Sequence, residues 1–155
     1  MESNNKVEYT LDDAIEFNKT GIEYYSQGRM GEALEQYKLA FIINTAKAPN
    51  TLSQAITYKN IGTLCCSLGK PNYALSIFQK ALEIEKKVAP EKGHIANTYN
   101  NIGEVYYSQG KLEEALEQHK IALQIQQDNG IELLDQADSY YNIGLAYYSQ
   151  GKHGE

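Results

Sequence analysis

Glycine recurs in this chain at a fixed interval of 41 residues, and this period limits the possible folds more than any other feature. The inner glycines of the pattern are Gly21, Gly62, Gly103 and Gly144. A closing glycine follows each of them seven residues later, at Gly28, Gly69, Gly110 and Gly151. A period in this range is typical of small structural units stacked in a row. The sequence therefore predicts a repeat protein in which each unit packs against its neighbours.

Around each inner glycine, apolar residues follow the spacing of one face of a helix. In the third unit this face carries Tyr99, Ile102, Gly103 and Tyr106. Successive residues of a helix are turned by about 100°, so these four lie on one side. A glycine inside a helix lowers the stability of the helix by about 1 kcal/mol relative to alanine. Its repeated presence therefore indicates a packing role, and we expect a neighbouring helix to approach its bare backbone closely. The closing glycine suits the left-handed conformation that ends many helices.

A second apolar stripe follows each closing glycine of the first three units, with the spacing small–x3–large–x2–small. Its members are Ala33, Tyr37 and Ala40; Ala74, Phe78 and Ala81; and Ala115, His119 and Ala122. Small residues at both ends of the stripe again indicate tight helix packing. Each unit is therefore predicted to be two antiparallel helices joined by a short turn that contains glycine.

These two stripes resemble the pattern of the tetratricopeptide repeat (TPR) family. The usual TPR period is about 34 residues, so the longer unit is similar to the extended repeats of kinesin light chain-type TPR proteins. The resemblance implies an all-α fold, a right-handed α-α superhelix or TPR solenoid of about seven antiparallel helices. The helices are expected over residues 11–27, 30–46, 51–68, 71–88, 94–109, 112–127 and 132–150.

The repeats also predict how the chain is divided. Residues 1–10 are polar and aperiodic, and we expect a disordered N-terminal segment there. Residues 11–151 are expected to form the TPR domain, and residues 152–155 a C-terminal tail. The units within the domain are expected at about residues 14–54, 55–95 and 96–136, with a partial unit at 137–151.

Composition argues against several classes of partner. The net charge is −6 over 155 residues, and nucleic-acid binding needs a basic stripe that this chain lacks. No apolar run reaches about 18 residues, which argues against membrane insertion. The two cysteines, Cys65 and Cys66, are adjacent and poorly placed to form a disulfide with each other. A cytoplasmic location is the expectation that follows.

The sequence does not predict an enzyme, a cofactor or a metal site. His94, His119 and His153 do not have the spacing of metal ligands. The glycines mark the repeat and do not form a phosphate-binding loop. No Ser/His/Asp or Cys/His group can be placed on one surface.

The side of each first helix opposite the packing stripe is the candidate binding site, because the TPR resemblance implies that this side lines a concave groove. The candidate peptide-binding residues are Asn18, Lys19, Ile22, Tyr25, Lys59, Asn60, Thr63, Asn100, Asn101, Glu104, Tyr107, Tyr141, Asn142, Leu145 and Tyr148. Charge is divided along this side, with Lys19 and Lys59 in one half and Glu104 and Asp138 in the other. A ligand is expected to place acidic groups near the lysines and basic groups near the carboxylates.

An asparagine column stands out among these candidates. Asn60, Asn101 and Asn142 occupy the same place in three units, although asparagine is a poor helix former. Each amide can donate to and accept from a peptide backbone, so the column suits an extended ligand. Shared descent of the repeats is the alternative explanation.

A tyrosine column runs beside it, at Tyr25, Tyr107 and Tyr148. Tyrosine offers rigid contact area that suits recognition. The same rings could instead pack against the neighbouring first helix, and the sequence leaves both interpretations open.

Two functions are consistent with these features. The first is a protein–protein interaction scaffold or adaptor that binds an extended segment of a partner protein in the groove. The second is a self-association module that forms dimers or filaments through its incomplete C-terminal repeat. There, Tyr140, Ile143 and Tyr147 have no following helix to pack against, and exposed apolar area of this kind favours association.

Overall fold

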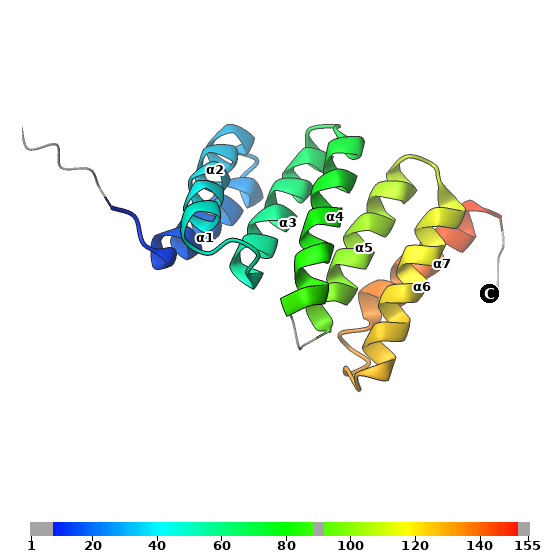
Figure 1. The fold of residues 1–155 in the computed structure, drawn as a ribbon. Helices are drawn as coiled ribbons and strands as arrows, with labels where there is room; N and C mark the ends of the chain where they lie inside the picture. Colours follow the sequence, from blue (N-terminus) through cyan, green and yellow to red (C-terminus); the bar gives the residue numbers. More distant parts are fainter. Residues whose placement is uncertain (1–7, 89–91, 152–155) are drawn as a thin grey trace, which may run out of the picture.

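The chain forms a row of helices that pack as antiparallel pairs. The computed structural model describes residues 8–88 and 92–151, and these ranges contain seven α-helices and no strand. The helices are α1 (Leu11–Ser26), α2 (Met30–Lys47), α3 (Leu52–Ser67), α4 (Pro71–Val88), α5 (Gly93–Ser108), α6 (Leu112–Asp128) and α7 (Ala137–Ser149). Figure 1 shows them following one another from α1 at one end to α7 at the other. The prediction of an all-α solenoid is confirmed.

Six helices begin and end within one or two residues of their predicted limits, but the predicted start of the last helix was wrong. It begins at Ala137, about five residues late. The Gln126 side-chain amide donates to the Asp135 carbonyl at 3.1 Å, and that of Gln136 donates to the Ile131 carbonyl at 2.7 Å. These bonds hold the segment before α7 in turns, which sequence periodicity does not reveal.

The two predicted terminal segments lie mostly outside the described residues. Residues 152–155 lie wholly outside them, as do residues 1–7 of the N-terminal segment. Within residues 8–10, Thr10 caps α1: its backbone N–H donates to the Asp13 carboxylate at 2.6 Å, and its hydroxyl accepts from the Asp13 N–H. This reciprocal pair is a capping box, which satisfies two backbone donors at the helix start.

The inner glycines allow the two helices of a pair to touch. A Cβ atom at Gly62 would lie 2.6 Å from the Phe78 ring, and one at Gly103 would lie 2.6 Å from the His119 ring. Gly21 faces the Tyr37 ring in the same way. These distances are far shorter than carbon–carbon contact, so the predicted close approach is confirmed in all three complete pairs. The closing glycines all have positive φ angles, between 68° and 75°.

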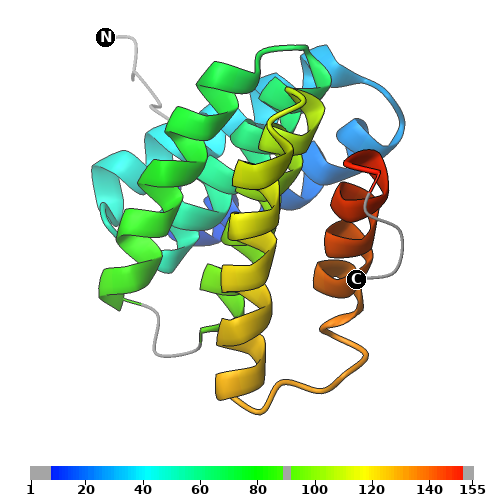
Figure 2. The same ribbon diagram turned by 90° about the vertical axis from the view of Figure 1, so that its right-hand side faces the viewer.

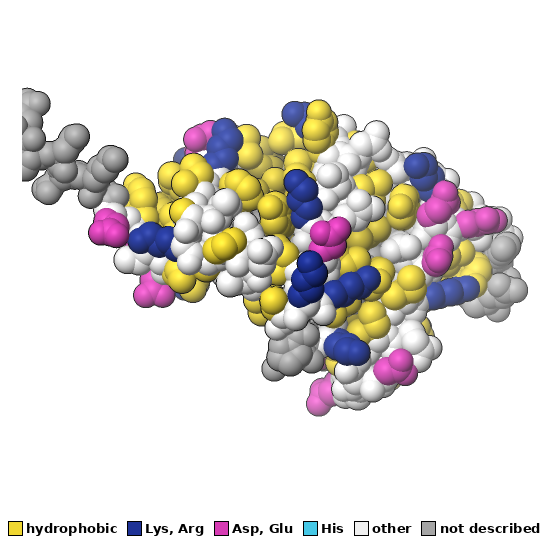
Figure 3. All heavy atoms as spheres, in the orientation of Figure 1, with side chains coloured by type: hydrophobic (Ala, Val, Ile, Leu, Met, Phe, Trp, Pro, Cys, Tyr) yellow, Lys and Arg dark blue, Asp and Glu magenta, His cyan; other side chains and the backbone are white. Residues whose placement is uncertain are grey.

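The stack curves because its first helices lie closer together than its second helices. α1 contacts α3, α3 contacts α5, and α5 contacts α7, whereas in the described part of the chain α2 does not contact α4, nor α4 contact α6. The face formed by α1, α3, α5 and α7 is therefore the concave one, and we call it the inner face. Figure 2 views the stack from the α7 end. Figure 3 shows that lysine, arginine and acidic side chains are interspersed over a face that includes α4 and α6.

Candidate peptide-binding groove

Three polar side chains meet at every junction between units. Each group contains one residue from a first helix, one from its second helix, and a hydroxyl residue from the next first helix. The groups are Asn18, Asn44 and Thr57; Lys59, Glu85 and Thr98; and Asn100, Gln126 and Ser139. Corresponding members are 41 residues apart, so the repeat carries a buried polar group as well as its apolar stripes.

The first and third junctions contain no charged side chain, and in them the amides of two candidate residues, Asn18 and Asn100, form hydrogen bonds within the protein. The Asn18 amide donates to the Thr57 hydroxyl at 2.8 Å and accepts from the Asn60 amide at 3.2 Å. The Asn100 amide donates to the Ser139 hydroxyl at 2.8 Å, and its oxygen pairs with His119 Nδ1 at 2.9 Å. Both asparagines are buried. The structure assigns these amides to the junctions, so they are not free to bind a ligand.

The middle junction is ionic. The Lys59 ammonium lies 2.9 Å from Glu85 Oε1, and the Thr98 hydroxyl donates to Glu85 Oε2 at 2.6 Å. Glu85 is fully buried, and a buried carboxylate needs a counterion. Lys19 is likewise paired, at 2.7 Å from Glu16. The expected attraction of acidic ligand groups to Lys59 therefore loses its basis, because its charge has a buried partner, whereas the Lys19–Glu16 pair is exposed on the surface and the expectation for Lys19 stays a prediction.

A first hollow of about 360 Å³ opens on the inner face between α3, α5 and α7. Its lining residues are Lys59, Asn60, Thr63, Asn97, Asn100, Asn101, Glu104 and Asp138. The Asn142 amide lies 3.5 Å from the Glu104 carboxylate. Partial burial, and to a smaller extent Asp138, raises the pKa of Glu104, while the Asn142 bond opposes this rise. The asparagine column therefore follows one strip of the inner face.

Two members of the tyrosine column close the inner face between units. The Tyr25 hydroxyl lies 2.6 Å from Ser67 Oγ on the next first helix, and the Tyr107 hydroxyl lies 2.8 Å from Ser149 Oγ. For these two rings the structure favours packing against the neighbouring helix. Tyr148, at the end of the stack, is 68% exposed.

A second hollow of about 290 Å³ opens at the middle junction, where Cys66 replaces the tyrosine of the column. Its lining residues are Tyr25, Thr63, Cys66, Ser67, Phe78, Asn101, Glu104, Val105 and Ser108. The hollow reaches the otherwise buried side chains of Phe78 and Val105. Cys66 is exposed at the mouth of the hollow, but partial burial of its thiol raises the thiol pKa to about 11, so the thiol is neutral at pH 7. The candidate list misses Cys66, although the break in the tyrosine column was a signal for it.

The sequence of the chain matches the model of the tetratricopeptide repeat family over residues 21–87 and 94–155. The chain belongs to this family. A TPR unit is two antiparallel helices with a glycine in the first, which is the arrangement seen here in each complete pair. No curated protein sequence matches the chain.

Solved TPR-like structures share the fold. BtubC (BKLC) from P. vanneervenii has a TM-score of 0.82 and 26% identity, over 96% of this chain and 61% of its own. A Rap protein complexed with competence and sporulation factor has a TM-score of 0.85 and 22% identity, over 95% of this chain and 40% of its own. A kinesin light chain-like protein from Podosopora anserina with nearly identical TPR-like repeats has a TM-score of 0.78 and 16% identity, over 94% of this chain and 70% of its own. The chain therefore spans less than two thirds of the first two proteins.

The remaining candidate residues lie on the same TPR helices but away from the two hollows. Ile22 is 49% exposed and Tyr141 is 66% exposed, while Leu145 is partly buried. Conversely, Asn97 and Asp138 line the first hollow but are not among the candidate peptide-binding residues, although the division of charge along this side already pointed to Asp138. Their places hold Ile15 and Ile56 in the first two units, so this column shows no common chemistry in the sequence.

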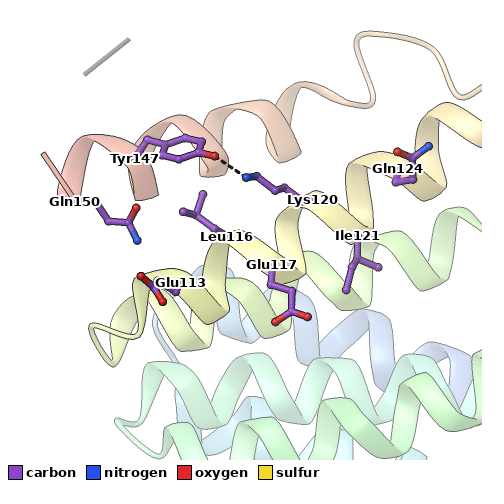
Figure 4. A pocket seen from close by; sticks show the side chains of 8 residues that line it. All are labelled: Glu113, Leu116, Glu117, Lys120, Ile121, Gln124, Tyr147 and Gln150. Carbon is purple, nitrogen blue, oxygen red and sulfur yellow. Dashed lines mark hydrogen bonds between the residues drawn. The ribbon is translucent and has the colours of Figure 1, made fainter. Parts of the chain in front are cut away.

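The α7 end of the TPR array presents a third hollow, of about 540 Å³, which we call the end hollow. Figure 4 shows Leu116, Lys120 and Ile121 of α6 and Tyr147 of α7 among the side chains that line it, with Lys120 bonded to the Tyr147 hydroxyl. Within the described residues, nothing lies within 4 Å of a Cβ placed at Gly144. The fourth inner glycine therefore lacks the ring that covers the other three.

Between residues 8 and 151, leaving out 89–91, no three His, Cys, Asp or Glu side chains are grouped to hold a metal ion. None of the helices in these ranges has the length and apolar character needed to cross a membrane.

Proposed function

We propose that residues 11–151 form a protein-interaction module whose inner face binds an extended peptide segment of a partner. The observation that carries this proposal is the pair of hollows, which share Thr63, Asn101 and Glu104 and so form one strip along the inner face. Amides, hydroxyls and carboxylates line this strip, and such groups can pair with the backbone of an extended chain. The fold also occurs in a Rap protein that was solved in complex with competence and sporulation factor.

The asparagine column supplies the contacts to the ligand backbone in this proposal. Asn60 and Asn101 line the first hollow, and Asn142 continues the column on α7 beside Glu104. Asn60 donates one N–H to Asn18 and keeps a second N–H and its oxygen for a ligand. All three are partly buried, which reduces the side-chain freedom that is lost on binding.

The charge of the strip favours a basic ligand. Glu85 neutralises Lys59, which leaves Glu104 and Asp138 as the carboxylates that line the first hollow. A ligand with lysine or arginine near these two residues is therefore expected, whereas acidic groups near Lys59 are no longer expected.

Replacing Asn101 and Asn142 together by alanine is expected to weaken peptide binding about tenfold or more. Each amide contributes hydrogen bonds worth about 1 kcal/mol, and alanine keeps the helices intact because it is the better helix former. A peptide selected on the wild-type module from a displayed random library provides the ligand, and fluorescence anisotropy measures its dissociation constant.

The matched control is the pair Gln79→Ala and Glu83→Ala, two exposed residues of α4 on the outer side. This control should bind the selected peptide as well as wild type does. Equal affinity of the asparagine double variant and wild type would remove the proposed role of the inner face.

The open α7 end supports self-association as a second candidate function. Among the described residues, a ring covers each of the first three inner glycines and none covers Gly144. A helix from a second copy that carries a large side chain could complete this end. The contact would bury apolar area of Tyr140, which is 45% exposed.

Gly144→Ala tests this second function, with Gly103→Ala for comparison. A Cβ at residue 144 meets nothing, so stability should stay unchanged or rise by about 1 kcal/mol. The same change at Gly103 forces a Cβ against the His119 ring and should destabilise the fold by about 1–3 kcal/mol. If copies associate through α7, sedimentation of wild type will depend on concentration and Gly144→Ala will shift it to monomer. A wild-type monomer at all concentrations rejects this function.

A further inference from the structure

The middle junction lacks a ring that the other two junctions contain. At the outer junctions, Tyr25 reaches Ser67 and Tyr107 reaches Ser149, each across to the next first helix. The matching pair at the middle junction is Cys66 and Ser108. Cysteine is too short to span this gap, and the Ser108 hydroxyl instead donates to the Val105 carbonyl of its own helix at 2.7 Å. The second hollow occupies the place where the missing ring would lie.

We propose that the ligand supplies this ring: a tyrosine side chain of the bound peptide occupies the second hollow, with its hydroxyl at Ser108 Oγ. This inference rests on the proposed function, because it names a side chain that the peptide must carry. It goes further in stating which junction reads the ligand and by what chemistry.

The size of the second hollow fits one side chain. Its volume of about 290 Å³ lies at the lower limit of ligand pockets, which hold about 300–1,000 Å³. The Tyr25 and Phe78 rings and the Val105 side chain form its apolar walls, so an entering ring would bury aromatic surface on several sides. Aromatic pairs of this kind add stability beyond the area they bury.

The polar atoms of the hollow favour a phenol over a purely apolar ring. Ser108 uses its proton to bond the Val105 carbonyl, so its oxygen can still accept from a ligand hydroxyl. The outer junctions show the same tyrosine–serine pair at 2.6 and 2.8 Å. The repeat itself therefore provides the template for the ligand contact.

The rim of the hollow adds a charge preference. Glu104 lines both hollows, and Asp138 lines the first. A basic residue beside the tyrosine would lie against these carboxylates, and complementary charge of this kind contributes to specificity. The occupant that fits is thus a peptide segment with a tyrosine next to a lysine or arginine.

p-Cresol, the side chain of tyrosine, tests the hollow directly. In a titration followed by NMR chemical shifts of backbone amides, wild type should bind it in the millimolar range with shifts at Thr63, Cys66 and Ser108. Cys66→Tyr restores the ring found at the outer junctions and should weaken binding at least tenfold. Gln79→Ala, an exposed α4 residue outside the hollow, should bind within threefold of wild type. Absence of binding to wild type, or equal binding to Cys66→Tyr, overturns the proposal.

Two charged phenols test the rim. Tyramine carries an amine and 4-hydroxyphenylacetate carries a carboxylate, so tyramine should bind several-fold more tightly, and Glu104→Gln should reduce this difference. Tighter binding of 4-hydroxyphenylacetate would overturn the preference for a basic neighbour.

Toluene, which is p-cresol without its hydroxyl, tests the contact with Ser108. Wild type should bind p-cresol more tightly than toluene, and in Ser108→Ala the ratio of the two affinities should fall towards one. An unchanged ratio would overturn the hydroxyl contact.

The same variants separate this inference from the proposed function. If selected peptides bind the inner face, show no enrichment of tyrosine and bind Cys66→Tyr as well as wild type, the tyrosine assignment fails while peptide binding stands. If p-cresol binds as expected but no peptide is selected, peptide binding fails while the phenol-binding hollow stands.

Discussion

Glu85→Ala is expected to lower the free energy of unfolding by about 3 kcal/mol. The change leaves the Lys59 ammonium without its partner at 2.9 Å, and only 14% of the lysine side chain is exposed. It also removes the acceptor of the Thr98 hydroxyl. Breaking a buried pair from one side costs about 3–5 kcal/mol, and we expect the lower value because Lys59 borders the first hollow, where water can solvate it. Urea denaturation followed by circular dichroism measures the change.

The neighbouring junction provides a control that removes the charges without leaving a partner behind. The triple variant Lys59→Asn, Glu85→Gln and Thr98→Ser reproduces the neutral group of Asn100, Gln126 and Ser139. It should recover most of the stability that Glu85→Ala loses, because it leaves no unpaired charge in the junction. If Glu85→Ala and wild type unfold at the same urea concentration, the ion pair is not a stabilising part of the junction.

Acidification from pH 7 to pH 4 is expected to remove roughly 3 kcal/mol of stability through His119 alone. Burial lowers the pKa of this imidazole from 6.5 to about 4 in the folded protein. In the unfolded chain the ring binds its proton near pH 6.5, so below this pH the unfolded state gains protons that the folded state cannot. Above about pH 6.5 His119 therefore takes nothing from the free energy of unfolding. As the pH falls from 6.5 towards 4, protonation of the unfolded chain lowers this free energy. Urea midpoints measured at successive pH values follow this loss.

His119→Phe is the matched control, because Phe78 occupies the same place in the preceding unit and faces Gly62 as His119 faces Gly103. The variant loses the bond between Nδ1 and the Asn100 oxygen, so its stability at pH 7 is not the test. Its stability should instead depend less steeply on pH between 6.5 and 4, since carboxylates then remain the groups that titrate. An unchanged slope would show that His119 is not responsible for the loss.

The sequence predicted the fold well because the packing of a TPR unit is encoded locally. An inner glycine and the large residue 16 positions later, such as Gly62 and Phe78, meet within one helical pair. The turn between these helices is short and contains a glycine at positive φ. Helical periodicity is thus sufficient to place the core. The start of α7 was missed because it depends on Gln126 and Gln136 side chains that bond to loop carbonyls.

The candidate groove was predicted only in part. Periodicity correctly placed Asn60 and Asn101 on one strip of the inner face, where both line the first hollow. It placed Asn18 and Asn100 on the same side, but their amides bond hydroxyl groups 39 residues further along the chain. Helical spacing describes the faces of a single helix. It does not say where the next helix covers the edge of such a face.

The sequence by itself determined the repeat and the pairing of helices, because both depend on spacing within about 40 residues, while the side that lines the groove followed from the resemblance to TPR proteins. Only the tertiary structure showed that Lys59 is neutralised by Glu85, that Tyr25 and Tyr107 close two junctions, and that Cys66 opens the third. These outcomes depend on contacts between successive units. Such contacts are set by the curvature of the stack, and a one-dimensional pattern does not contain it.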